Sequence, residues 1–139
     1  MPLEMESLIN AVDSLRRSLD AVGGDLGGFT DDQKETLRAG VIQNFEVAYE
    51  QCWKFAQRWL RENRSPEDAD FPKTRKDLFR VAARAGLVSD PTPWFGFGDA
   101  RNLTSHTYDH AQAERVYEAA VGFLPYAQEL VARLKERND

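Results

Sequence analysis

The feature that most constrains the fold is one long helical pattern of apolar residues in the first half of the chain. Apolar side chains recur every three or four residues, at Leu37, Val41, Phe45, Ala48, Cys52, Phe55 and Trp59. This spacing places them on one face of an α-helix, and Thr30 with Gln33 forms a capping-box pattern at its start. A helix unbroken from Thr30 to Glu62 would extend about 48 Å at 1.5 Å per residue. That length favours an elongated helical bundle over a compact globin-like packing.

Further periodic segments predict the other helices of this bundle. The predicted helices cover about residues 5–22, 30–62, 74–85, 99–108 and 110–137. The polar stretch 63–72 is predicted to be a loop. The stretch 87–99 is rich in Pro, Gly and aromatic residues, and we expect it to pack as a short ordered turn. Because no segment shows the alternation typical of strands, we expect an all-α fold, an up-and-down antiparallel bundle of four to five helices with long second and last helices.

The length of the chain limits it to one domain. With 139 residues, it can bury one hydrophobic core but not two, so we expect a single domain over residues 1–139. No apolar run approaches the roughly 20 residues that span a bilayer, and residues 1–19 lack the basic-then-apolar order of a signal peptide. We therefore expect a cytoplasmic protein with no membrane partner. The lone cysteine, Cys52, cannot form an intramolecular disulfide and is predicted to lie in the core.

Basic residues gather in one short segment of an acidic chain. The net charge is −5, but five basic residues and one acid lie between Lys73 and Arg84, so this stretch carries +4 and the remainder −9. Such a local field attracts phosphate-bearing partners. Arg75, Lys76 and Arg80 are therefore candidates for substrate binding, although on charge alone a solvated helix face without a ligand is the simpler interpretation.

The other concentration of chemically useful side chains is the segment RNLTSHTYD, residues 101–109. If it continues as an α-helix at 100° per residue, its polar residues share one side while Leu103 faces the bundle. These polar residues are Arg101, Asn102, Ser105, His106, Tyr108 and Asp109.

A single helix through this segment conflicts with the helix that follows. The apolar stripe of residues 116–127 would fall on the same side as the polar group. One solution is a break near Tyr108, with Asp109 capping the next helix and Gln112 completing a capping box. The other solution is a second subunit that covers the polar side.

Each of these residues also has a purely structural interpretation. Arg101 can pair with an acid, Asn102 can satisfy a buried backbone group, and a single histidine such as His106 is more often structural than catalytic. Tyr108 can be a core aromatic with its hydroxyl bonded to backbone. His106 and His110 have the i,i+4 spacing of a helical zinc site, but no third ligand is evident, and we expect no metal.

The segment 101–109 resembles a known family. Its pattern Arg101-Asn102-x3-His106-x-Tyr108 matches the Arg-x4-His-x-Tyr signature of the HEPN superfamily. It is especially similar to the branch called nucleotidyltransferase substrate-binding proteins. Segments 44–60 and 74–90 and Trp94 are also similar to that branch, so that the resemblance covers roughly residues 35–135.

The resemblance implies a helical bundle, usually dimeric, encoded beside a minimal nucleotidyltransferase. It implies no cofactor and two alternative roles. In one, the bundle binds the substrate of the transferase. In the other, it is a metal-independent ribonuclease toxin that the transferase neutralises by adenylylating the motif tyrosine, here Tyr108. The resemblance implies that Arg101, Asn102 and His106 are the catalytic residues and that Ser105 and Asp109, beside them, bind the substrate.

The residue types fit RNA cleavage by the RNA's own 2′-hydroxyl. This reaction needs a base, an acid and positive donors for the developing phosphorane charge. An imidazole such as His106 can transfer protons near neutral pH, and the guanidinium of Arg101 can grip a phosphate. Because one chain offers one histidine at the motif, a homodimer with two motifs would supply both acid and base. The same residues would also bind a nucleotide without cleaving it, and a purely structural dimer is the third alternative.

Overall fold

A computed structural model describes residues 3–65, 67 and 74–138. Within these residues the chain forms α1 (Glu6–Gly23), α2 (Asp31–Asn63), α4 (Arg75–Arg84), α5 (Thr92–Asn102), the short 3-10 helix η1 (Leu103–His106) and α6 (His110–Glu136). No strand occurs in this part of the chain. The prediction of an all-α bundle with long second and last helices is confirmed. The predicted loop 63–72 falls largely outside the described residues.

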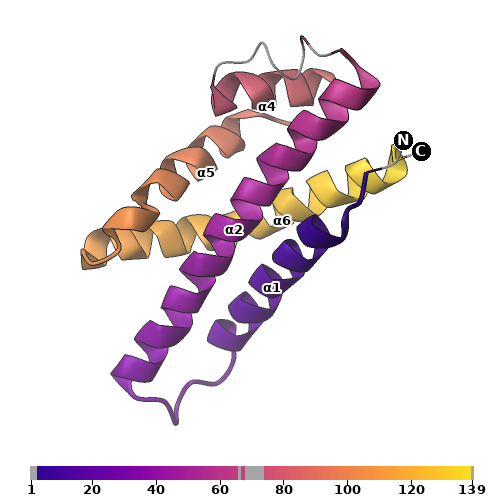
Figure 1. Ribbon diagram of the computed structural model, residues 1–139. Coiled ribbons are helices and arrows are strands. Elements are labelled where there is room, and N and C mark those ends of the chain that lie inside the picture. The colour runs from indigo at the N-terminus through magenta and orange to yellow at the C-terminus, as the bar shows by residue number, and fades with distance from the viewer. Residues whose placement is uncertain (1–2, 66, 68–73, 139) are drawn as a thin grey trace.

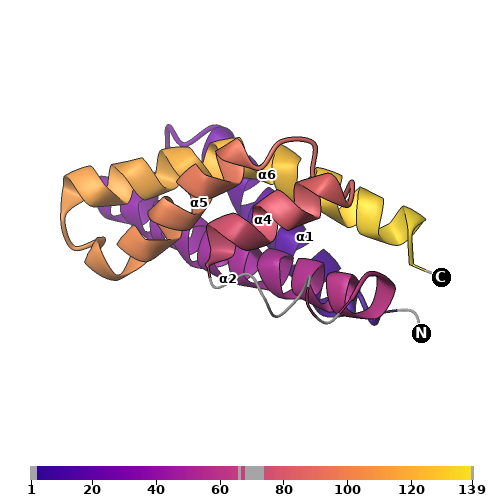
Figure 2. The ribbon, with the colours of Figure 1, turned by 90° about the horizontal axis from the view of Figure 1, so that it is seen from above.

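The helices pack around the long α2. Helix α1 lies beside α2 and runs in the opposite direction, while α6 crosses both, and α4 and α5 lie on the other side of α2 (Figures 1 and 2). The two ends of the chain meet, because the Leu3 amide donates to Asn138 Oδ1 and Asn138 Nδ2 donates to the Leu3 carbonyl. This meeting point lies at the opposite end of α6 from the turn that connects α5 to α6 (Figure 1).

The predicted helix signals are present at the helix ends. The Thr30 hydroxyl accepts from the Gln33 amide, and the Gln33 side chain accepts from the Thr30 amide, which completes the capping box of α2. Helix α4 ends in a Schellman motif, in which Gly86 adopts a φ of +82° and the Leu87 amide bonds to the Ala82 carbonyl. The described helices include none long and apolar enough to cross a membrane.

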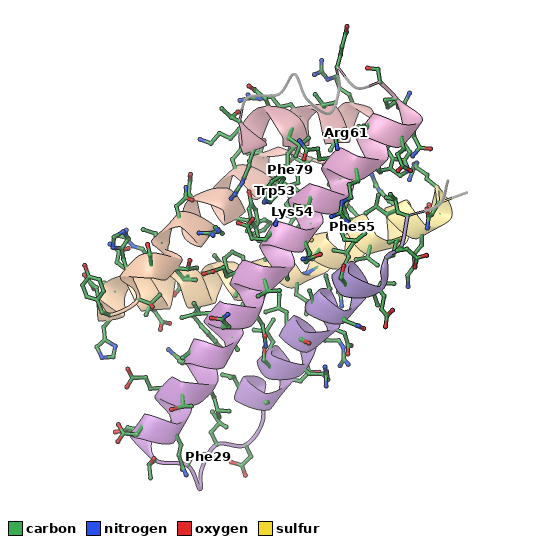
Figure 3. The ribbon with its side chains drawn as sticks, in the orientation of Figure 1. Phe29, Trp53, Lys54, Phe55, Arg61 and Phe79 are labelled. Carbon is green, nitrogen blue, oxygen red and sulfur yellow. The ribbon has the colours of Figure 1, made fainter. Side chains whose placement is uncertain are left out.

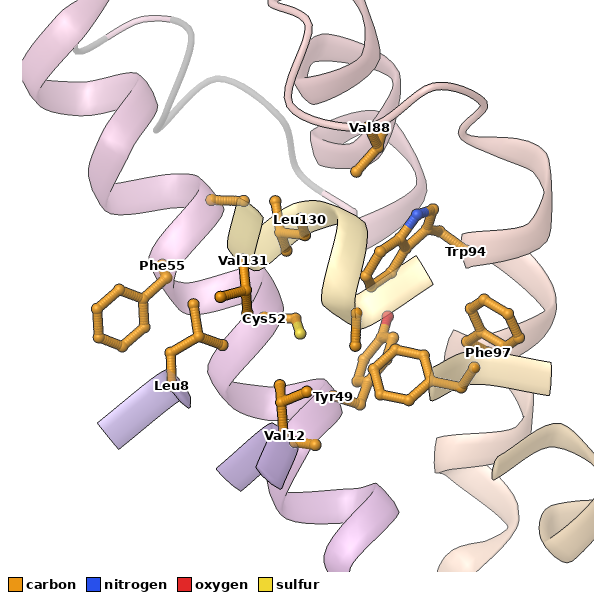
Figure 4. Packing of buried hydrophobic residues seen from close by; sticks show 14 of the residues in the cluster. Leu8, Val12, Tyr49, Cys52, Phe55, Val88, Trp94, Phe97, Leu130 and Val131 are labelled. Carbon is orange, nitrogen blue, oxygen red and sulfur yellow. The ribbon is translucent and has the colours of Figure 1, made fainter. Parts of the chain in front are cut away.

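An aromatic cluster forms the centre of the core and joins α2 to α4, α5 and α6. Phe79 and Trp94 stack with ring centroids 4.5 Å apart, and Phe123 of α6 meets Trp94, Phe97 and Phe45 edge-on at 5.1 to 5.5 Å. Edge-to-face and stacked pairs of this kind add to the stabilisation from burial. Cys52 is fully buried beside this cluster, as predicted (Figure 4).

The prediction of a short turn over 87–99 is wrong in its second half. Helix α5 begins at Thr92, seven residues before the predicted start at Asp99, and Pro93 lies in its first turn. Proline is tolerated there because the amides of the first turn have no intrahelical acceptor. Trp94, Phe97 and Ala100 are buried along one face, so that tertiary packing outweighs the low helix propensity of Gly96 and Gly98.

The α-helix predicted over residues 99–108 is wrong after Asn102, whereas the predicted break near Tyr108 is confirmed. Helix α5 ends at Asn102, and the chain tightens into η1 before α6 starts at His110. A 3-10 helix advances about 120° per residue, so the predicted angles on an α-helical wheel do not hold after Asn102. The predicted exposure does hold, because Ser105, His106 and Tyr108 are exposed while Leu103 is partly buried. The predicted cap is confirmed, because Asp109 Oδ1 accepts from the Ala111 amide. The capping box is not formed, because Gln112 Oε1 is buried without a hydrogen-bond partner among the described residues.

Candidate functional site

The largely buried carboxylate of Glu50, on α2, fixes the position of Arg101. Arg101 Nε donates to Glu50 Oε1 at 2.7 Å, and Arg75 Nη2 lies 3.2 Å from the same oxygen. Trp53 Nε1 donates to the other oxygen, Oε2, at 2.9 Å. Trp53 projects from α2 beneath α4, and the Arg75 guanidinium lies 4.8 Å from its ring centroid (Figure 3). Residues from three helices thus converge on Glu50, whose side chain is only 19% exposed.

The ionised form of Glu50 is favoured by these partners. Burial alone would raise the pKa of this carboxyl, but the hydrogen bonds from Trp53 and Arg101 and the charge of Arg75 outweigh it and leave the pKa below its usual value of 4.5. Glu50 therefore stays negative at neutral pH and fixes both arginines by charge-assisted contacts.

The Glu50 cluster predicts a pH dependence of stability. Because the folded-state pKa of Glu50 is depressed, its contribution is fully present above the unfolded value of about 4.5 and is lost as the pH falls through the folded pKa. We expect Glu50→Gln to lower the urea midpoint clearly at pH 7 and much less at the lowest pH where the protein is folded. A midpoint difference that does not shrink with pH would contradict this assignment.

A cavity of about 450 Å³ opens beside this cluster, between the start of α4 and the end of α5. Its wall includes the cationic side chains of Arg75, Lys76 and Arg101 and the amide of Asn102. The cavity thus brings together four predicted site residues, two from the basic segment 73–84 and two from the motif 101–109. Arg80 is not part of this wall. It pairs with Asp77 of the same helix and lies over the Phe95 ring.

The remaining motif residues lie outside the cavity, toward the turn before α6. His106 and Ser105 are exposed on η1, and Asp109 is engaged as the cap of α6. Tyr108 is 86% exposed, so the alternative of a buried core tyrosine is wrong. The His106 and Tyr108 rings lie near each other, with centroids 6.2 Å apart.

Tyr108 borders a second, larger cavity. This cavity has a volume of about 690 Å³ and lies between the first half of α2 and the start of α6. Its wall includes Lys34, Arg38, Glu46 and His110. In a single chain, Arg101 and Tyr108 therefore border different cavities.

Glu50, Trp53 and Tyr49 were not predicted as site residues. None of them belongs to the apolar stripe of α2 or to the two segments that were predicted to bind a ligand. The sequence does contain one sign of the contact: Glu50 and Trp53 are three residues apart, at the border of the apolar stripe of α2, where a carboxylate can reach a neighbouring helix.

Among the described residues, no group of three His, Cys, Asp or Glu side chains is arranged to hold a metal ion.

Comparison with known proteins identifies the family. The sequence profile of the family described as "Nucleotidyltransferase substrate binding protein like" matches residues 3–136. The chain belongs to this family, in agreement with the resemblance seen in its motif.

Relatives of the chain include a protein of known sequence and proteins of solved structure. A Haemophilus influenzae protein named "Probable ribonuclease HepT" is 39% identical over 105 residues, which are 76% of this chain and 72% of the relative. A solved structure from Haemophilus influenzae, described as revealing the fold of a substrate binding domain of a nucleotidyltransferase, is 33% identical with a TM-score of 0.87, over 95% of this chain and 99% of that one. A solved structure from Thermus thermophilus, at 24% identity and a TM-score of 0.71 over 91% and 98% of the two chains, shares the fold.

Proposed function

We propose that the chain is the HEPN subunit of a two-component system of the toxin-antitoxin type and cleaves RNA without a metal ion. The observation that supports this most is the fixed guanidinium of Arg101 in a cationic cavity, one 3-10 turn from the exposed imidazole of His106. The similarity to a protein named "Probable ribonuclease HepT" agrees with this chemistry. The partner is a minimal nucleotidyltransferase, as the family description suggests.

In the proposed reaction, the ribose 2′-oxygen attacks the adjacent phosphorus and the bond to the 5′-oxygen breaks. A base takes the proton of the 2′-hydroxyl, and an acid gives a proton to the departing 5′-oxygen, leaving a 2′,3′-cyclic phosphate. His106 performs the proton transfers, while Arg101 and Asn102 donate hydrogen bonds to the phosphate oxygens. Only Nε of Arg101 is engaged by Glu50, so within the described residues its two Nη groups are available to an anion.

The alternative function is a non-catalytic subunit that binds the nucleotide or substrate of the transferase. It is favoured by the solved relative described as a substrate binding domain of a nucleotidyltransferase. Incubation of the purified protein with mixed RNA and tRNA in EDTA separates the two. Cleavage that yields cyclic-phosphate ends supports the ribonuclease, and inactivity of the wild-type protein supports the binding subunit.

The ribonuclease mechanism predicts a homodimer. One chain presents one motif histidine, and a separate base and acid need two. The break at η1 removes the conflict between the motif and α6, so the proposal of a dimer rests on this chemical need and on the exposure of His106 and Tyr108. Light scattering is expected to give about twice 15.8 kDa. A monomer at tens of micromolar would remove the two-motif mechanism.

Tyr108 is the proposed site of regulation by the transferase. Its exposed hydroxyl is accessible to a modifying enzyme, and an AMP group on it would lie beside His106 and obstruct the approach of RNA. We expect Tyr108→Phe to leave the melting temperature unchanged and to abolish the AMP adduct seen by mass spectrometry after incubation with the cognate transferase and ATP. An adduct that persists in Tyr108→Phe, or none on the wild type, would refute this assignment.

A further inference from the structure

The cavity between α4 and α5 has the charge of an anion site. Arg75, Lys76 and Arg101 border it, and among the described residues Asp99 is the one acid in its wall. Glu50 lies behind Arg75 and Arg101 and orients them. Lys76 is exposed, and no carboxylate among the described residues pairs with it. A cation on the rim of a cavity that has no acidic partner is available to a bound phosphate.

Two buried polar atoms in the same wall lack hydrogen-bond partners. Tyr49 Oη and Trp94 Nε1 are both buried, and neither makes a hydrogen bond within the described part of the chain. Leaving such groups unsatisfied costs stability, so their retention points to a role in binding. Burial raises the pKa of Tyr49 to about 12, which keeps its hydroxyl protonated as a donor.

The backbone of Gly98 lies against the Tyr49 hydroxyl in the wall of the cavity. A Cβ at Gly98 would lie 2.8 Å from Tyr49 Oη, so glycine is required for this close approach. The partly exposed Phe95 supplies aromatic surface in the same wall. The volume of about 450 Å³ lies within the usual range for small-ligand sites, roughly 300 to 1,000 Å³.

We propose that this cavity binds one nucleoside phosphate unit, with its phosphate against Lys76 and Arg75 and its base against the ring of Phe95. Asn102 and Arg101 connect the cavity to the motif. The role of this nucleotide site in RNA cleavage rests on the proposed function. The unit can be part of an RNA or a free nucleotide, and the experiment separates these sources.

The first measurement is the binding of 5′-mononucleotides to His106→Ala protein, which has its cavity intact but is proposed not to cleave. Calorimetry reports binding, and the combined fluorescence of Trp53, Trp59 and Trp94 is a second readout. Lys76→Gln is expected to weaken binding about tenfold, the loss of about 1.4 kcal/mol from one charged contact. The matched control is Arg84→Gln, which removes a charge from the exposed far end of α4, away from this cavity. Equal weakening by both variants, or no binding at millimolar nucleotide, overturns the proposal.

The second measurement tests the buried hydroxyl. Tyr49→Phe is expected to weaken mononucleotide binding severalfold while leaving the unfolding midpoint equal to or above that of the wild type. A purely structural role for the hydroxyl would leave nucleotide affinity unchanged, and that result would overturn its assignment.

The source of the nucleotide follows from a comparison of ligands. If RNA is the source, a short RNA with 2′-deoxy substitution at the cleaved position binds more tightly than a mononucleotide, and Lys76→Gln raises the KM of cleavage. If a free nucleotide is the source, the oligonucleotide binds no more tightly. Nucleotide binding by a wild-type protein that cleaves no RNA would support the nucleotide site in this cavity and refute the ribonuclease activity. Cleavage of RNA with no effect of Lys76→Gln on nucleotide binding would support the ribonuclease activity and refute the nucleotide site.

Discussion

Replacement of His106 by alanine is expected to lower RNA cleavage about a thousandfold while leaving the protein folded. The side chain is exposed and makes no hydrogen bond within the described residues, so its loss removes chemistry without removing packing. General acid–base catalysis by one side chain contributes about a hundredfold to ten-thousandfold to rate. The measurement is the initial rate on a cleaved RNA in EDTA, together with the circular dichroism spectrum and melting temperature of the variant.

The chain supplies a matched control for this experiment. His110 is the other histidine, lies four residues further on and is also exposed, but it borders the cavity of Tyr108 instead of the one beside Arg101. His110→Ala is therefore expected to keep near-wild-type activity. If both histidine variants cleave as the wild type does, the proton transfers belong to another group and His106 has no catalytic role.

Gly98→Ala is expected to cause a larger loss of stability than any other single-methyl change near the site. In an exposed helix this substitution would stabilise by about 1 kcal/mol. Here the new Cβ would lie 2.8 Å from Tyr49 Oη, which real contacts do not tolerate. Overpacking of this kind costs about 1 to 3 kcal/mol, so the sign of the effect is expected to reverse. Urea unfolding measures it directly.

The cause of that loss can be isolated by a double-mutant cycle with Tyr49→Phe. Without the hydroxyl, the nearest ring atom is Cζ, at 3.6 Å from the added Cβ, an ordinary contact. Tyr49→Phe alone should be neutral or stabilising, because it removes an unsatisfied buried group. The double variant should then recover most of the lost free energy. Strictly additive effects would show that Gly98 is required for another reason.

The helices with an unbroken apolar stripe could be predicted from the sequence. Burial in α2 and α6 follows the three-four spacing, and their caps at Thr30 and Asp109 come from local hydrogen bonds that short-range patterns describe. Helix α5 could not be predicted in the same way. Its Pro93, Gly96 and Gly98 all disfavour a helix locally, and the burial of Trp94 and Phe97 against distant residues decides the outcome.

The motif and the basic residues of the candidate site could be predicted from the sequence, but their geometry and their partner Glu50 could not. The spacing of Arg101 and His106 identified the motif, yet the chain changes from α-helix to 3-10 helix at Leu103, which an α-helical spacing does not predict. The contact between Glu50 and Arg101 joins residues 51 positions apart, and no local pattern specifies such a partner. The approach of Arg75 to the same carboxylate depends on how α4 packs on α2.

The pairing of Leu3 with Asn138 has a practical consequence for handling the protein. Leu3 and Asn138 lie together, and the length of α6, about 40 Å at 1.5 Å per residue, separates them from the turn that carries His106 and Tyr108. A fluorophore, affinity tag or surface tether attached at either end therefore leaves the motif unobstructed for single-molecule or immobilised assays. A short peptide that joins the two ends would also permit circular permutants with new ends placed elsewhere, such as the exposed connection around Phe29 (Figure 3).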